Sequence, residues 1–310
     1  MVAEGVAEDA EEAVVVAEAD PMNAFHDRLG LGWRADLAAG ILSHLDRIDL
    51  LEVIADDFFS APRREVRALK TLSSQVPVVL HGVGMGLASC APVETKLLEN
   101  MARLVEQVRP QFWSEHLAFV RGGGMEIGHL AAPPRTADTV DGAAENLSRA
   151  SRLIGSKPIM ENIATLINPP GSTLSESAWI SAILDASDCD LLLDLHNVYA
   201  NGLNHGYDPG DFLRQIPSAR MGVIHIAGGE FISSPDGRQR IVDDHLHDVP
   251  DPVFELLEEA AAISPNPLTV ILERDGAYPS MDCLLAQIEL ARQALARGRA
   301  RRTALQEVLL

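Results

Sequence analysis

Short apolar runs recur along this chain, and most of them end abruptly in a charged or polar residue. In the clearest case, Leu191 to Leu193 are followed by Asp194 and, after Leu195, by His196 and Asn197. An apolar run without polar alternation is typical of a strand buried on both faces, as in a parallel sheet. Parallel α/β proteins place their chemistry at the carboxyl ends of such strands. The repeated pattern therefore predicts both a fold and the position of a functional site.

Eight such runs are separated, in most cases, by segments whose apolar residues have helical spacing. In the segment 92–109, for example, Leu97, Leu98, Met101 and Val105 fall on one helix face. The predicted strands cover residues 29–34, 48–54, 76–82, 112–117, 157–162, 190–194, 221–229 and 268–274. Eight strands alternating with helices describe an α/β fold of the (β/α)8 type, the TIM barrel.

The chain shows no linker rich in Pro, Gly and Ser that would divide it. We therefore expect one TIM-barrel domain over residues 23–310, which includes a C-terminal segment, 280–310, of one or two helices. Residues 1–22 are mostly Ala, Glu, Asp and Val with little periodicity, and we interpret them as a disordered acidic leader. The glycine-rich segment 121–134 is expected to be a loop, either a mobile lid or a turn. It lacks the spacing of a phosphate-binding loop.

Composition narrows the class of protein. The 310 residues are 47% hydrophobic, so the chain is long enough to bury a sizeable core. A net charge of −20 argues against binding to nucleic acid, which requires a basic face. The sequence has neither a secretory signal nor an apolar stretch of about 18 residues, so we expect no membrane partner. Three isolated cysteines, Cys90, Cys189 and Cys283, suggest no disulfide framework and favour a cytoplasmic location.

Metal-ligand residues recur at the predicted strand ends. A closed barrel brings the carboxyl ends of distant strands onto one face, so these side chains are expected to converge. In chain order they are Glu52, His81, His116, Glu161, Asp194, His225 and Glu273. Buried carboxylates repel one another and lose their hydration unless cations neutralise them. A single histidine at a strand end is more often structural, but the recurrence favours bound metal.

The donor set contains nitrogen and oxygen atoms and no thiolate, which suits iron, manganese or zinc and disfavours an iron–sulfur cluster. It exceeds the three or so protein ligands of a single catalytic metal, so two or more metals are indicated. A second cluster, Asp243 to Asp248, holds three acids and two histidines and is expected in a loop. It could add a metal together with Asn197, or it could be a solvated turn. We leave Glu52 outside the ligands, as a supporting or ion-paired residue.

Nine short runs together give the chain a family resemblance. They are GLGWR, EVIADDFF, LHGVG, SEHLAFV, ENIATLI, DLHNVYANG, HIAGG, DDHLHDVPDPV and LERDGAYP. Their combination resembles the multinuclear non-haem iron-dependent oxidases, the family of the methanobactin biosynthesis oxidase. The resemblance covers residues 29–280, nearly the whole predicted barrel.

The resemblance implies a function. Members of that family are TIM barrels that hold two or three irons in mixed Fe(II)/Fe(III) states and use dioxygen as co-substrate. They oxidatively modify ribosomally synthesised precursor peptides, often at cysteine. A small partner protein usually recruits the leader of the peptide. The resemblance therefore implies a precursor peptide and a leader-recognition protein as partners.

The resemblance also implies ligand roles. His81 and His116 would bind one iron, and Glu161 would bridge it to a second. The second iron would be completed by Asp194, His225 and Glu273, and a third would use Asn197, Asp243 and His245. His247 is an alternative ligand, because the run here carries an extra His-Asp, and His196 could compete with Asn197. The candidate catalytic residues are Glu161, Asp194 and His247.

Two other functions fit parts of the pattern. A divalent-metal barrel of the xylose isomerase or endonuclease IV type also collects His, Glu and Asp at its strand ends, and zinc or manganese without iron would favour it. The negative charge weakens the nuclease version. A non-catalytic metal-storage or binding module would instead hold metal with closed coordination.

Overall fold

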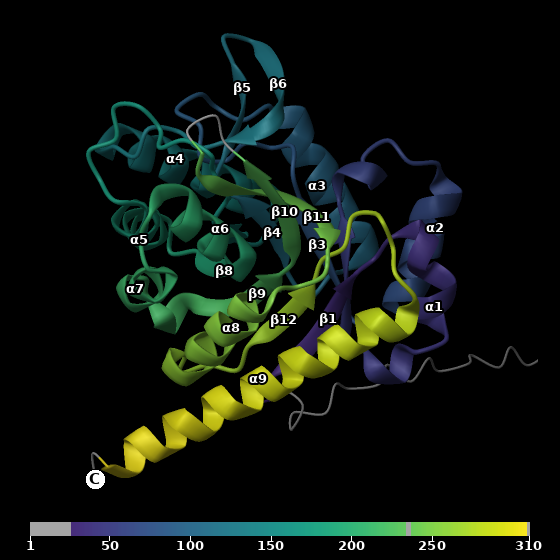
Figure 1. The fold of residues 1–310 in the computed structure, drawn as a ribbon. Helices are drawn as coiled ribbons and strands as arrows, with labels where there is room; N and C mark the ends of the chain where they lie inside the picture. Colours follow the sequence, from purple (N-terminus) through teal and green to yellow (C-terminus); the bar gives the residue numbers. More distant parts are fainter. Residues whose placement is uncertain (1–25, 234–236, 309–310) are drawn as a thin grey trace, which may run out of the picture.

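Eight parallel strands close into a barrel in the computed structural model, which describes residues 26–233 and 237–308 (Figure 1). Around the barrel the strand order is β1-β12-β9-β8-β7-β4-β3-β2. The strands are β1 (Arg28–Gly32), β2 (Leu50–Ile54), β3 (Val78–Gly82), β4 (Trp113–His116), β7 (Ile159–Glu161), β8 (Asp190–Asp194), β9 (Met221–Ile226) and β12 (Thr269–Leu272). The TIM barrel expected from the sequence is confirmed. The proposed leader, residues 1–22, lies outside the described residues.

Helices surround the barrel on its outer face (Figure 1). They are α1 (Ala38–Leu42), α2 (Arg63–Ser73), α3 (Thr95–Val108), α4 (Ala137–Ile154), α5 (Glu176–Ser187), α6 (Leu195–His205), α7 (Pro209–Gln215), α8 (Asp251–Ile263) and α9 (Met281–Val308). Their apolar stripes face the strands; in α3 the buried residues are Leu98, Met101, Leu104 and Val108. Within the described part of the chain, no helix is both long and apolar enough to cross a membrane.

The interior of the barrel is arranged in layers. An apolar cluster that is at most 3% exposed consists of Leu50, Val79, Leu192, Val223 and Ile271. Side chains two positions apart on a strand point to the same face, so the residues two places further along also point inward. Those residues are Glu52, His81, Asp194, His225 and Glu273. An apolar floor therefore supports a polar layer at the carboxyl-end mouth of the barrel.

Two antiparallel hairpins rise from this mouth, and the sequence did not predict their strands. The first pairs β5 (Phe119–Gly122) with β6 (Met125–Ala131) across Gly123 and Gly124, whose positive φ angles of 59° and 80° suit a glycine turn. The turn was predicted, but the loop assigned to residues 121–134 was wrong over these strands. The reason is exposure: β6 buries none of its residues fully, so it carries no apolar run.

The second hairpin pairs β10 (Gly228–Ser233) with β11 (Gln239–His247). The cluster 243–248, expected in a loop, therefore lies mainly on a strand. A further difference is α6, a helix that begins directly after β8 and was not predicted from the sequence. The Asp194 side chain caps this helix by accepting a hydrogen bond from the backbone N–H of Asn197 at 2.7 Å.

The packing of α9 against α8 depends on Gly298. A Cβ atom at this position would lie 2.3 Å from the carbonyl oxygen of Glu258 and 2.6 Å from the Cβ of Ala261. We expect Gly298→Ala to lower the free energy of unfolding by about 1–3 kcal/mol, because two packed helices must separate. Thermal and denaturant unfolding measure this change. Gly222→Ala, whose Cβ would have no neighbour within 4 Å, is the matched control and should have little effect.

Candidate metal centre

The seven strand-end residues predicted from the sequence meet in the mouth of the barrel. All of them are buried, and the most exposed, His116, retains 8% of its accessible surface. Neighbouring strands bring several of them together directly, since His116 is in register with Glu161 and Asp194 with His225. Within the described residues, all of them but Glu52 form two compact groups, one of three residues and one of four, and every member is a histidine or a carboxylate of the kind that holds hard or borderline cations.

The first group joins two imidazoles and one carboxylate. Nε2 of His81 and Nε2 of His116 each lie 3.5 Å from Oε2 of Glu161, and the two ring centroids are 4.6 Å apart. One ligand atom from each residue lies within 4.8 Å of the others. A hydrogen bond of 2.8 Å between Nδ1 of His81 and the hydroxyl of Ser114 orients that ring. Burial holds the pKa of His81 well below its usual value, so this ring is in the neutral form that binds metals.

The second group consists of Glu161, Asp194, His225 and Glu273, again with ligand atoms within 4.8 Å of one another. Nδ1 of His225 lies 3.3 Å from Oε1 of Glu161 and 3.0 Å from Oε2 of Glu273. On the other side of the ring, Nε2 of His225 is 2.9 Å from Glu52, which therefore orients the imidazole as a supporting residue. Glu161 takes part in both groups, with one carboxylate oxygen facing each.

The atoms in this centre fit metal ions. Oε2 of Glu161, Oδ2 of Asp194, Nδ1 of His225 and Oε2 of Glu273 are buried and have no hydrogen-bond partner among the described residues. Buried polar atoms without partners are costly, and bound cations would satisfy all four. In the protein alone, burial and then the charges of Asp243 and Glu161 raise the pKa of Asp194 well above its usual range. The neighbouring side chains therefore do not supply enough positive charge to neutralise Asp194.

A third set of expected ligands lines a cavity together with His116 and Glu161. Asn197 donates from Nδ2 to the carbonyl of Asn162 at 3.0 Å, which leaves its buried Oδ1 without a partner. Oδ1 of Asp243 is 2.8 Å from Nε2 of His245. His245 has a positive φ of 55°, a conformation that costs free energy in a non-glycine residue and that often occurs at functional sites. These three residues are looser than the first two groups, which alone are compact among the described residues.

His247 does not join this centre. Its side chain is 51% exposed near the end of β11, where Nδ1 lies 3.1 Å from Oδ1 of Asp244 in a hydrogen bond. The expectation that His247 acts as a ligand or catalytic residue finds no support in this placement. The ring of His196 does lie beside the set, with Nδ1 3.0 Å from Oδ1 of Asp243 and Nε2 buried without a partner.

Two residues at the site were missed by the sequence analysis. Glu115 is fully buried, its carboxylate oxygens have no hydrogen-bond partner among the described residues, and Oε1 lies 3.9 Å from Nδ1 of His116. Asn162 fastens β8 by accepting from the backbone N–H of Asp194 at 2.9 Å and donating to its carbonyl at 3.0 Å. Both residues adjoin a predicted ligand in the sequence, which was the available signal.

A cavity of about 460 Å³ opens onto these ligands. His116, Glu161, Asn197, Asp243 and His245 form its polar side. Its remaining wall is largely apolar and comes from the two hairpins and the segment after β7: Phe119, Leu130, Ala131, Ile163, Leu166, Ile167, Pro169, Pro170, Ile241 and Val242. The centre is therefore buried on the barrel side and accessible from the mouth, as a catalytic metal site requires.

Comparison with known proteins identifies the family. The model of the family described as "RiPP precursor modification enzyme MbnB/TglH/ChrH" matches residues 28–296, and the chain belongs to this family. RiPPs are ribosomally synthesised and post-translationally modified peptides. A UPF0276 protein of Acaryochloris marina is 31% identical over 84% of this chain and 92% of its own length. One from Nitrosospira multiformis is 32% identical over 84% of this chain and 90% of its own length. The family relationship expected from the sequence is confirmed.

Solved structures agree on the fold. An L-ribulose 3-epimerase has a TM-score of 0.57 with 14% sequence identity, over 91% of this chain and 98% of that one. A xylose isomerase-like TIM barrel from Mycobacterium smegmatis, in complex with magnesium, has a TM-score of 0.55 with 10% identity, over 87% and 97%. At such low identity the likeness extends to the barrel and not to the reaction.

Glu161 is the residue whose loss should disturb both groups. We expect Glu161→Gln to lower the metal content per chain by at least half, because the substitution removes the charge that the two groups share. Elemental analysis of the purified protein measures this ratio. Glu126→Gln, on the exposed strand β6, is the control and should retain the full metal content. An unchanged ratio in Glu161→Gln would contradict the shared role.

His245 and His247 provide a matched pair two residues apart on β11. Because only His245 lines the cavity, we expect His245→Ala to lose bound metal and His247→Ala to retain it. The same elemental analysis, combined with an activity assay, separates the two variants. Equal losses, or a loss in His247→Ala alone, would restore the role that the sequence suggested for His247.

Proposed function

We propose that this protein is an iron- and dioxygen-dependent enzyme that oxidises a ribosomally synthesised precursor peptide, at cysteine or at another side-chain or backbone position. The observation that carries the proposal is the pair of buried ligand groups joined by Glu161 beside an open cavity. Membership of a family of precursor-modifying enzymes supports the peptide as substrate. The absence of thiolates among the ligands suits non-haem iron.

The two compact groups of ligand residues support an assignment of metals to them. His81, His116 and Glu161 would hold one iron, and Glu161 would share a second with Asp194, His225 and Glu273. The looser set would hold a third: Asn197, Asp243 and His245. When bound, the irons would supply Lewis acidity and the electrons that activate dioxygen as the oxidant.

The chain itself contributes orientation and exclusion of water. Glu52 and Ser114 fix the rings of His225 and His81, so these ligands need not reorganise when the substrate binds. The apolar wall of the cavity keeps bulk water away from the reacting centre. Glu161 and Asp194 are the proposed catalytic carboxylates, and each has a buried oxygen without a hydrogen-bond partner among the described residues.

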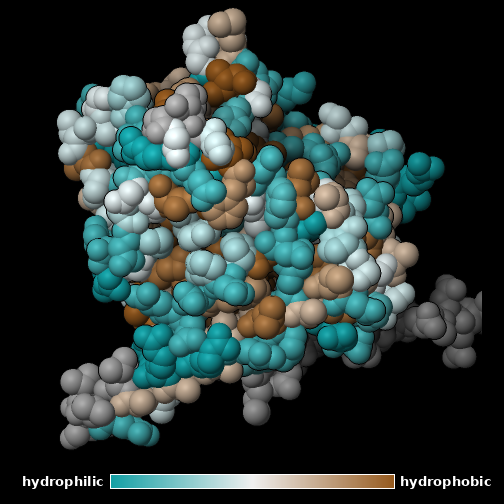
Figure 2. Space-filling view, viewed as in Figure 1, coloured by the Kyte–Doolittle hydropathy of each residue, from teal (hydrophilic) through white to brown (hydrophobic). Residues whose placement is uncertain are grey.

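Exposed apolar residues at the mouth support a peptide rather than a small polar substrate. Among the described residues, six large apolar side chains are exposed on segments that follow the carboxyl ends of the strands: Met125, Ile127, Leu166, Ile167, Phe231 and Leu246. In Figure 2 hydrophobic residues appear among hydrophilic ones on the upper part of the molecule, where the β5–β6 hairpin projects in Figure 1. Clustered apolar exposure of this kind is typical of surfaces that bind other chains.

We include a small leader-recognition protein as a partner. The exposed strand β6 at the edge of the first hairpin supports this part of the proposal, because an edge strand can pair with an added strand. The alternative, a divalent-metal isomerase of the xylose isomerase type, is supported by the barrel fold. The largely apolar cavity wall disfavours it, because a sugar requires many hydrogen-bonding groups.

Oxygen uptake tests the reaction. Protein loaded anaerobically with iron should consume dioxygen when its cognate peptide is added, and mass spectrometry should detect an oxidised peptide. Zinc- or manganese-loaded protein is the control and should consume none. An iron-loaded protein that leaves both dioxygen and the peptide unchanged would refute the proposal, as would sugar isomerisation by the manganese form.

Ile167 tests whether the peptide contacts the mouth. This side chain is 70% exposed beside the cavity, and covering it with a peptide would remove apolar surface from water. We expect Ile167→Ser to raise the KM for the peptide about tenfold, since one buried aliphatic side chain contributes roughly 1.5 kcal/mol or more. Leu290→Ser, on exposed α9 surface, is the control and should leave both KM and kcat unchanged.

A further inference from the structure

A groove on the outer wall of the barrel has a charge opposite to that of the protein as a whole. It lies between α2 and α3, has a volume of about 570 Å³ and contains no metal-centre residue. Its lining residues are Phe58, Phe59, Ala61, Arg63, Val66, Arg67, Lys70, Asn100, Arg103, Leu104 and Gln107. Within the described chain, four of these residues are cationic and none is acidic. The chain has 45 acidic and 25 basic residues, so this bias is unusual.

The cations of this α2–α3 groove lack counterions. Arg63, Arg67 and Lys70 are exposed, and at spacings of four and three residues they share one face of α2. Among the described residues, none of the three has an ion pair or a side-chain hydrogen bond, and Arg103 donates only to Asn100, at 2.6 Å. Unpaired like charges on one helix face repel one another. An anionic occupant would remove this repulsion.

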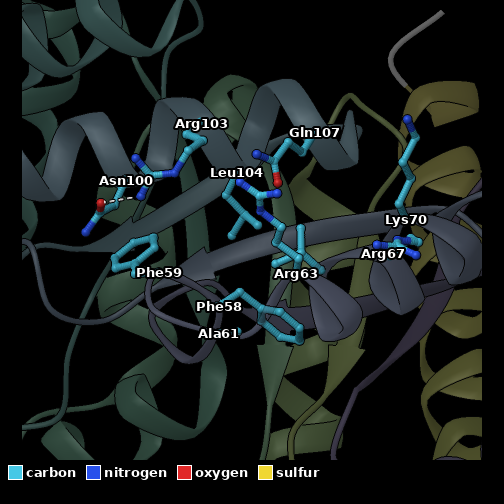
Figure 3. Close-up of a pocket in the computed structure, with 11 residues that line it drawn as sticks. Phe58, Phe59, Ala61, Arg63, Arg67, Lys70, Asn100, Arg103, Leu104 and Gln107 are labelled. Atoms are coloured by element: carbon cyan, nitrogen blue, oxygen red, sulfur yellow. Dashed lines mark hydrogen bonds between the residues drawn. The ribbon is translucent and has the colours of Figure 1, made fainter.

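The two ends of the groove differ in chemistry. Figure 3 shows Phe58 and Phe59 towards one end, Arg67 and Lys70 at the other, and Arg63 between them. Since α2 follows β2, its first residues lie towards the mouth and Lys70 lies towards the opposite, amino-terminal face of the barrel. The occupant should therefore present apolar residues to the phenylalanine end and carboxylates to the lysine end.

The chain contains a segment with this pattern. Before His26, where the described structure begins, the sequence has seven acidic residues and no lysine or arginine. The acids are Glu4, Glu8, Asp9, Glu11, Glu12, Glu18 and Asp20, and Val14, Val15 and Val16 stand among them. β1 starts at Arg28 on the amino-terminal face of the barrel, so the preceding residues join the described chain on the same face as the lysine end of the groove.

We propose that the α2–α3 groove binds the acidic segment Glu4–Asp20 of the same chain. Glu18 and Asp20 lie against Arg67 and Lys70, and Val14 to Val16 lie against Phe58 and Phe59. Arg63 to Lys70 spans about 10 Å of helix. Five extended residues, the separation of Val15 and Asp20, span about 16 Å, so the segment is long enough to continue past Arg63 towards the phenylalanine end. The covalent connection raises the effective concentration of the segment at the groove, so weak charge pairing suffices. The proposal is independent of the reaction at the metal centre.

Zero-length carbodiimide cross-linking of the full-length protein tests this contact, because the sequence has three lysines: Lys70, Lys96 and Lys157. We expect a link between Lys70 and a carboxylate of residues 4–20, mainly Glu18 or Asp20, with at least tenfold the yield of any link from that segment to exposed Lys96. The link from Lys157 to Asp188, whose charged atoms are 2.5 Å apart, is an internal standard. Equal yields at Lys70 and Lys96, or no link at Lys70, would overturn the proposal.

Two further experiments test whether the contact depends on charge pairing. Arg67→Glu should lower the Lys70 link at least threefold, whereas Arg64→Glu, on the same helix but outside the groove, should not. Raising the salt concentration to about 0.5 M should weaken the link without any substitution, since it screens surface charges. Insensitivity to both changes would refute charge pairing. Mixing isotope-labelled and unlabelled protein identifies the source of the segment, and a link only between copies would replace this proposal with a dimer contact.

Discussion

The burial of several carboxylates and imidazoles within a few ångströms is the constraint on which the rest of this structure depends. Glu161, Asp194 and Glu273 lie together beneath the surface, and each keeps an oxygen without a hydrogen-bond partner among the described residues. His225 is the only residue of that compact group that can carry a positive charge, and it lies beside Glu52, Glu161 and Glu273. Burial alone would lower the pKa of His225, but the charges of these glutamates outweigh it and raise the pKa well above the usual value. One imidazolium cannot balance them. Metal cations would resolve the imbalance, and under the proposed function Glu161 would share its charge between two of them.

The barrel supports this cluster of buried polar groups with separate layers of residues. The apolar cluster around Leu192 and Val223 closes the interior below the ligands and excludes water from that side. Groups outside the ligand set hold the donors in place: Glu52 orients His225, and Asn162 fastens the backbone at Asp194. Hairpins and the segment after β7 then add an apolar rim above the centre. The ligand residues thus form a small polar layer between two apolar layers. We propose that the peptide reaches this layer only through the mouth of the barrel.

The fold was easiest to predict from the sequence at strands that are buried on both faces. Strands such as β8 appear as continuous apolar runs, so the barrel and the ligands at its strand ends, including His81 and Glu273, could be predicted. The hairpins could not, because exposed strands such as β6 carry no apolar periodicity. Spacing alone also could not distinguish His245 from His247: the hairpin pairing is irregular between Gly228 and Glu230, and the backbone at His245 is left-handed. The α2–α3 groove depends on side chains from separate helices, which no local pattern reveals.

The most direct test of the central claim is anomalous diffraction at the iron edge from crystals of the iron-loaded protein. We expect at least two strong peaks, one between His81, His116 and Glu161 and one among Glu161, Asp194, His225 and Glu273. Crystals that show the same barrel and side-chain positions, but no anomalous peak at either place and full hydrogen bonding of the carboxylates to water, would contradict it.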